Sequence, residues 1–124
     1  MINVKVLESG ENYLETILML NKQNDNKTRA IDVTNALGFS KPTVSIMLKQ
    51  LRENGYVTVN EKGHISLTQS GLNIANKVYE KHVVITEALI RIGVNHDTAY
   101  KDACKIEHDI SDETFSKLKE YLNK

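Results

Sequence analysis

The residues GFSKP at positions 38 to 42 restrict the fold of this chain more than any other stretch. Gly38 is the residue type that most often follows the end of a helix, and Pro42 suits the first turn of the next helix but not its interior. Ser40, between them, is a favourable helix N-cap. Apolar residues on both sides repeat with a helical period. The sequence therefore predicts two short helices, over residues 29–37 and from residue 40 to about 54, joined by a tight turn.

The neighbouring segments extend this pattern in both directions. Residues 9–22 carry apolar side chains at helical spacing, and we expect a helix there with Ser9 as its N-cap. After Gly55 the stretches YVTVN and HISLT alternate between apolar and polar residues, and the EKG between them suits a hairpin turn. Three helices followed by a hairpin is the order of a winged helix-turn-helix domain.

The rest of the chain is predicted to be helical. A long helix is expected from residue 68 or 70 to about 92, a short one over residues 98–108, and a last one from Ser111 onward. The expected fold class is thus mainly α, with a small two-stranded wing. We predict two domains, a winged helix-turn-helix over residues 1–69 and a helical domain over residues 70–124.

Composition narrows the classes of function. The chain has 16 Lys and Arg against 16 Asp and Glu, so any nucleic-acid site must be a local basic patch. A single cysteine rules out an internal disulfide and suits the reducing cytoplasm. There is no apolar run of membrane-spanning length and no signal peptide, so we expect no membrane association. The sequence shows no nucleophile–base pair and no phosphate-binding glycine loop, and we therefore expect neither an enzyme nor a small-molecule substrate.

A DNA-binding role follows from the second helix of the predicted turn. In a helix-turn-helix the N-terminus of that helix meets the base edges, and short hydroxyl side chains there can contact bases and phosphates. Lys49 and Arg52 add positive charge along the same helix, and Lys62 lies at the tip of the predicted wing. A solvated face of a protein-interaction module is the alternative, but we favour double-stranded DNA. The candidate DNA-contacting residues are Ser40, Lys41, Pro42, Thr43, Ser45, Lys49 and Lys62.

A second candidate site lies near the C-terminus. Cys104, Glu107 and His108 are spaced i, i+3, i+4, which places three metal-ligating side chains on one face of a helix. Taken alone this trio is a weak signal, because such spacing arises by chance and a lone cysteine is usually a small buried hydrophobe. Carboxylate, imidazole and thiolate together would suit a first-row divalent ion.

Several segments, in this order, resemble the diphtheria toxin repressor and manganese transport regulator family: SGENYLETIL, AIDVTNALGFSKPTVSIMLKQLRENGYV, LTQSG, VYEKH and ACKIEHDISDE. The resemblance extends over about residues 8–118. It implies a metal-activated transcriptional repressor that binds iron(II) or manganese(II) and then operator DNA as a homodimer. It also implies an N-terminal winged helix and a C-terminal helical dimerisation domain. The length of 124 residues suits the short form that lacks an SH3-like domain.

The resemblance also implies a set of metal ligands, although this chain departs from the family pattern. Asn12 stands where the family has Met or Asp, and Cys104 of the iron type is combined with Glu15 of the manganese type. Thr86 and Tyr100 replace a Glu and a His of an ancillary site, which is therefore expected to be incomplete. The implied ligands are Asn12, Glu15, His82, Cys104, Glu107 and His108.

Two functions remain in competition at this stage. The first is a manganese- or iron-dependent repressor of metal-uptake genes that binds palindromic DNA. The second is a metal-independent winged-helix regulator with a degenerate site, which the neutral amide of Asn12 suggests. Other divalent first-row ions would bind such a donor set at least as well in vitro, because affinity follows the Irving–Williams order.

Overall fold

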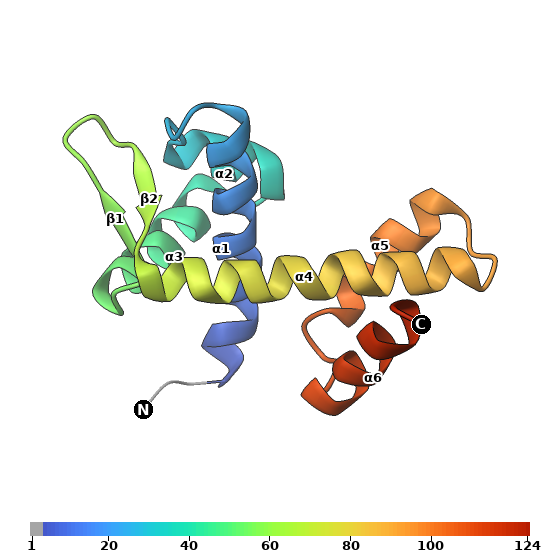
Figure 1. Ribbon diagram of the computed structural model, residues 1–124. Helices are drawn as coiled ribbons and strands as arrows, with labels where there is room; N and C mark the ends of the chain where they lie inside the picture. The colour runs from blue at the N-terminus through green and yellow to red at the C-terminus, as the bar shows by residue number, and fades with distance from the viewer. Residues whose placement is uncertain (1–3) are drawn as a thin grey trace. The chain divides into compact units, whose positions relative to one another are not determined.

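A computed structural model describes residues 4–124, and their side chains from residue 9 onward. The chain forms two compact units, Met1–Asn76 and Lys77–Lys124, and one helix, α4, contributes to both. This architecture confirms the expected mainly α fold with a two-stranded wing. No helix among the described residues is long and apolar enough to cross a membrane. The elements are α1 (Val4–Gln23), α2 (Ala30–Leu37), α3 (Lys41–Glu53), β1 (Val57–Val59), β2 (Ile65–Leu67), α4 (Gln69–Arg91), α5 (His96–Ile106) and α6 (Asp112–Leu122) (Figure 1).

The turn between α2 and α3 forms as the sequence predicts. Gly38 adopts a left-handed conformation with φ 73°, and its N–H donates to the Thr34 carbonyl at 2.9 Å. Ser40 is the N-cap of α3, where its hydroxyl accepts from the Thr43 N–H at 3.3 Å. Pro42 lies in the first turn of α3, where no intrahelical donor is lost. These local interactions fix where α3 begins.

The wing is an antiparallel hairpin in which Val57 pairs with Leu67 and Val59 with Ile65. Its turn is held by Asn60, whose side-chain oxygen accepts from the Lys62 and His64 N–H groups at 2.9 Å each. The turn brings Lys62 to the tip of the wing, as predicted from the sequence.

The core of the first unit is built from one face of each helix and from the inner face of the hairpin. Helix α1 contacts α2 and β2, and α3 contacts α2 and β1. Burying these apolar faces supplies most of the favourable free energy of folding. The fully or almost fully buried members of this core include Leu14, Ile17, Val33, Val44, Leu51, Val57 and Ile65.

Two predicted helices, α1 and α5, differ from the structure by two or more residues at an end. Helix α1 begins at Val4 and not at Ser9, because residues 4–8 contain no Gly or Pro that would interrupt it. Helix α5 covers His96–Ile106 and not residues 98–108. Its N-cap is Asn95, whose side-chain oxygen accepts from the Asp97 N–H at 2.9 Å, so a local cap that the sequence reading passed over moves the whole helix.

Close packing at the start of α4 leads to a stability prediction. A Cβ on Gly71 would lie 2.1 Å from the Tyr56 carbonyl oxygen, a backbone atom that cannot move away without shifting the wing. Ala normally stabilises a helix interior relative to Gly by about 0.5–1 kcal/mol. Here we expect the opposite sign, a loss of about 1–3 kcal/mol from overpacking in Gly71→Ala. The measurement is the free energy of unfolding in urea at one protein concentration.

Gly10→Ala is the matched control for this substitution. A Cβ on Gly10 would meet only the end of the flexible Leu51 side chain, at 3.3 Å. We therefore expect Gly10→Ala to be close to neutral. A Gly71→Ala variant as stable as wild type would show that the approach of α4 to Tyr56 is not close enough to exclude a methyl group.

The second unit consists of the later turns of α4 together with α5 and α6. Ser111 caps α6 as predicted, with its hydroxyl accepting from the Thr114 N–H at 3.1 Å. Lys119 of α6 donates to the Glu80 carboxylate of α4 at 2.6 Å. The apolar residues buried in this unit are Val78, Ile85, Ala99, Ala103 and Phe115.

Candidate metal centre and nucleic-acid interface

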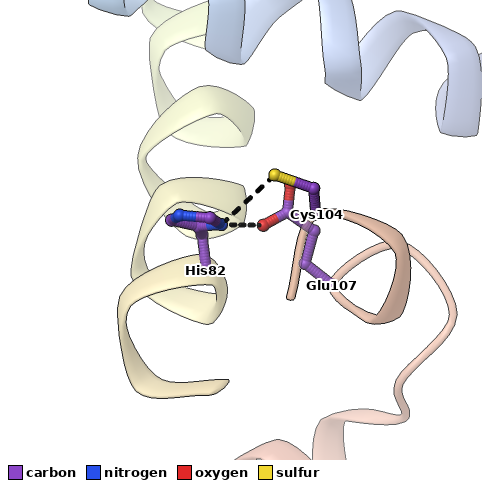
Figure 2. A group of neighbouring side chains, drawn as sticks. All are labelled: His82, Cys104 and Glu107. Atoms are coloured by element: carbon purple, nitrogen blue, oxygen red, sulfur yellow. Dashed lines mark hydrogen bonds and ion pairs between the residues drawn. The ribbon is translucent and has the colours of Figure 1, made fainter. Parts of the chain in front are cut away.

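Three metal-ligating side chains meet between α4 and α5. Figure 2 shows the His82 ring, on α4, facing the side chains of Cys104 and Glu107 at the end of α5. One donor atom from each residue lies within 4.8 Å of the other two. Two helices far apart in the sequence therefore bring nitrogen, sulfur and oxygen donors to one place. We call this group the donor cluster.

The donor cluster is partly assembled by its own hydrogen bonds. His82 Nδ1 lies 3.0 Å from Glu107 Oε2 and 3.8 Å from Cys104 Sγ. The Glu107 side chain is only 1% exposed, and a buried carboxylate is costly unless cations or donors surround it. His108 Nε2 is 3.5 Å from the other Glu107 oxygen, so two imidazoles flank this carboxylate. The buried Glu107 carboxylate thus places a negative charge at this site, which favours binding of a cation.

The donors fit a first-row divalent ion. Bonds from such an ion to N, O and S ligands are about 2.0–2.3 Å, so two ligands of one ion lie no more than about 4.5 Å apart. The separations of 3.0 and 3.8 Å from His82 Nδ1 fall within that limit, and all three donor atoms lie within 4.8 Å of one another, so a shift of a few tenths of an ångström at most would let them share one ion. Imidazole nitrogen, carboxylate oxygen and a single thiolate form a set of intermediate softness, which suits this class of ion.

The end of α5 differs from the sequence prediction in a way that matters for His108. The helix ends at Ile106, and Glu107 is its C-cap, with φ −57° and ψ −25°. The Glu107 N–H still donates to the Ala103 carbonyl at 2.9 Å, so its side chain keeps the direction of a helical residue. His108 falls in the turn that follows, outside the donor cluster of the described residues. The predicted helical face therefore holds for Cys104 and Glu107, whereas His108 approaches from the turn.

Tyr100 is a neighbour of the donor cluster that the sequence analysis did not identify as such. Its ring meets the His82 imidazole edge-on, with ring centres 4.6 Å apart and planes at 79°. Tyr100 precedes Cys104 by four residues, a spacing that could have placed both on one face of α5. The Thr86 hydroxyl is buried and has no hydrogen-bond partner among the described residues. The two positions at which the ancillary metal site is expected to be incomplete thus carry an aromatic ring and a hydroxyl.

The other two predicted ligands belong to the first unit. Asn12 and Glu15 are three residues apart on α1, so they share one side of that helix. Glu15 is 8% exposed and Asn12 is half-buried. Their participation in a metal site stays a prediction. Next to them, burial of Tyr13 raises the pKa of its phenol.

The predicted nucleic-acid surface lies on α3 and the wing. Ser40 donates to the Thr43 hydroxyl at 2.9 Å, which orders two polar side chains at the start of the helix. Ile46 is 61% exposed on the same helix, an apolar residue that the sequence analysis missed although it falls outside the buried stripe of α3. Apolar side chains on such a helix can contact the methyl group of thymine. All seven predicted DNA-contacting residues are exposed: Ser40, Lys41, Pro42, Thr43, Ser45, Lys49 and Lys62.

Comparison with known proteins relates the two halves of the chain to two domains of the same kind of repressor. The family described as iron dependent repressor, N-terminal DNA binding domain, matches residues 5–65, and the metal binding and dimerisation domain of the same repressors matches residues 68–124. An HTH-type transcriptional regulator of Methanocaldococcus jannaschii is 34% identical over 118 residues, 94% of either chain. The chain belongs to the iron-dependent repressor family. This confirms the family resemblance drawn from the sequence.

A further relative and two solved structures show how far the likeness extends along each chain. The transcriptional regulator MntR of Escherichia coli is 31% identical over 92% of this chain and 73% of its own length. A solved structure of the manganese regulator SloR is 28% identical with a TM-score of 0.81, covering 92% of this chain and 53% of that one. A solved structure from Sulfolobus solfataricus is 26% identical with a TM-score of 0.69, covering 90% and 85%. The chain thus spans about half the length of SloR and most of the Sulfolobus protein.

Proposed function

We propose that this protein is a metal-dependent transcriptional repressor that binds double-stranded operator DNA as a homodimer. The observation that carries the proposal is the donor cluster, because His82, Cys104 and Glu107 offer three donors within 4.8 Å. The winged helix-turn-helix in the same chain supplies a DNA-reading surface. The family match to a DNA-binding domain and to a metal-binding and dimerisation domain supports both halves of the proposal.

The proposed ion is Mn(II) or Fe(II). Relatives of this chain include the regulator MntR of Escherichia coli and the iron-dependent repressor IdeR of Mycobacterium bovis, the latter 29% identical over 96% of this chain. His82 Nδ1, Cys104 Sγ and the Glu107 carboxylate would hold the ion. We include His108, Asn12 and Glu15 as further ligands on the family resemblance. A bound divalent cation would neutralise the buried Glu107 charge and join α4 to α5.

The proposed response is a coupling between metal and DNA. Asn12 and Glu15 belong to the unit that carries α3, whereas His82 and Glu107 belong to the unit that matches a dimerisation domain. Ion binding to this ligand set would favour the dimer in which the two α3 helices have the spacing that the operator requires. An ion favours that state only by binding it more tightly than the other states. A hundredfold preference corresponds to about 2.7 kcal/mol, within the usual range of such couplings.

The proposed place of action is the cytoplasm. A repressor must reach the DNA, and a chain whose one cysteine cannot form an internal disulfide suits that reducing compartment. The relatives named above are transcriptional regulators rather than enzymes, and we propose no catalytic step for this chain.

The test is the metal dependence of DNA binding. A duplex is selected from a random-sequence pool with the metal-stripped protein in the presence of Mn(II), and its affinity is then measured by fluorescence anisotropy with Mn(II) or with chelator. We expect Mn(II) to tighten binding by about 10–100-fold, the range of typical allosteric coupling. Equal affinity with and without chelator would favour the metal-independent regulator. Failure to select any duplex would contradict a DNA-binding role.

A further inference from the structure

A groove runs between α3 and the wing. It has a volume of about 290 Å³ and lies entirely within the first unit. Its apolar lining comes from Ala30 of α2, Leu48 of α3, and Val59 and Ile65 of the hairpin. The other lining residues are Ser45, Lys49 and Arg52 of α3 and Gly63 of the wing. Helix α3 and the hairpin therefore form most of a single concave surface, which the start of α2 completes.

The charge of this groove has one sign. Lys49 and Arg52 are three residues apart on α3, so their side chains lie on the same side of the helix. Both are exposed, and neither forms an ion pair with another residue of the described part of the chain. The residues that line the groove include no acidic side chain. Since the whole chain has no net charge, two uncompensated cations at one groove are a local feature that favours an anion.

We propose that this groove seats the sugar–phosphate backbone of the operator DNA between the part read by α3 and the part touched by the wing. The inference rests on the DNA-binding function proposed above. When a recognition helix lies in the major groove and a wing reaches the adjacent minor groove, the strand that separates the two grooves passes between them. Lys49 and Arg52 contact phosphate oxygens there, and Leu48 and Val59 pack against deoxyribose.

This assignment separates two kinds of DNA contact on α3. Ser40 and Thr43, at the start of the helix, are placed to read bases, whereas Lys49 and Arg52 bind a backbone that is the same for every sequence. Arg52 was not among the DNA-contacting residues expected from the sequence and gains a role from its place on the groove. Contacts of this kind determine affinity and its dependence on salt rather than specificity.

The test compares Lys49→Gln and Arg52→Gln with Lys117→Gln, the same charge change at an exposed position on α6. DNA affinity is measured at saturating Mn(II) over a range of KCl concentrations, for the selected duplex and for an unrelated one. Each groove variant should weaken binding to both duplexes by a similar factor. Each should also reduce the slope of log K against log salt by about 0.9, the contribution of one phosphate. Lys117→Gln should change neither quantity.

Other results would overturn the assignment. Wild-type affinity and slope in both groove variants would show that no backbone lies in the groove. A loss confined to the selected duplex would mean that Lys49 or Arg52 reads bases. A third outcome combines two results. If the groove variants bind DNA like wild type, and if inorganic phosphate at constant ionic strength shifts the NMR resonance of the wild-type Gly63 amide, the groove binds a small anion and not DNA. Wild type that bound neither duplex would refute the proposed function itself, which distinguishes that failure from failure of the groove alone.

Discussion

Glu107→Gln should lower the affinity for divalent ions by at least about 100-fold and abolish metal-stimulated DNA binding while leaving the fold intact. Substitution of residues that merely support a metal ligand already costs about 10–100-fold, and Glu107 is the proposed ligand itself. Glutamine has the same shape and keeps a hydrogen-bonding group 3.0 Å from His82 Nδ1, but it lacks the negative charge. Because glutamine keeps the shape and the hydrogen bonding of this 1% exposed side chain and removes a charge that is costly to bury, we expect the fold to be kept.

Cobalt(II) titration of the metal-stripped protein under anaerobic conditions measures this effect directly. A thiolate ligand gives a charge-transfer absorption band between sulfur and cobalt(II). If Cys104 Sγ binds the ion, the wild type shows this band and Cys104→Ser does not. Glu120→Gln, an exposed position on α6, is the matched control for the loss of one carboxylate. If Glu107→Gln kept the wild-type metal affinity and DNA response, Glu107 would be only a packing partner of His82, and the proposed metal centre would be wrong.

The helix-turn-helix could be predicted from the sequence because its determinants are local. Gly38, Ser40 and Pro42 act on backbone within four residues of themselves, and each performs the expected role. Ser9 is a favourable cap and predicts a helix that starts there, but α1 already runs through Ser9 from Val4. The predicted start of α5 at residue 98 is also too late, because Asn95 caps the helix. Boundaries depend on which of several possible caps is used, and tertiary packing contributes to that choice.

Residue spacing in the sequence predicts only part of the donor cluster. Cys104 and Glu107 lie close in sequence, so their shared face follows from helix geometry. His82 is 22 residues from Cys104, and its place in the cluster came from the family resemblance, since packing of α4 against α5 decides it. The contact of Tyr100 with His82 depends on the same packing. The groove beside Lys49 and Arg52 likewise forms only when the hairpin packs against α3, so no local sequence pattern predicts it.

The largest stability effect is expected from Asn21, a buried polar residue near the end of α1. Its side-chain nitrogen donates to the Ile65 carbonyl of the wing at 3.1 Å, and its oxygen accepts from the Thr28 N–H at 3.4 Å. Thr28 is fully buried, and its carbonyl accepts from the Ile65 N–H at 2.8 Å. One side chain thus ties α1, the segment before α2 and strand β2 together in the interior of the first unit.

Asn21→Leu should lower the free energy of unfolding by about 2–4 kcal/mol. Leucine fills nearly the same space but leaves the Thr28 N–H and the Ile65 carbonyl without this partner, and each buried group left unsatisfied costs about 1–3 kcal/mol. Urea unfolding at one fixed protein concentration measures the loss, with Asn35→Leu on the exposed side of α2 as the control.

Amide hydrogen exchange identifies where the Asn21→Leu variant is weakened. The Ile65 N–H should exchange faster, because its acceptor on Thr28 is no longer held by Asn21. Since β2 supplies part of the DNA groove, the same variant should bind DNA more weakly. His82, Cys104 and Glu107 of the second unit should still bind a divalent ion. If the variant had the stability of wild type and the same exchange rate at the Ile65 N–H, water would have replaced the Asn21 amide. The wing would then be held by its apolar contacts alone.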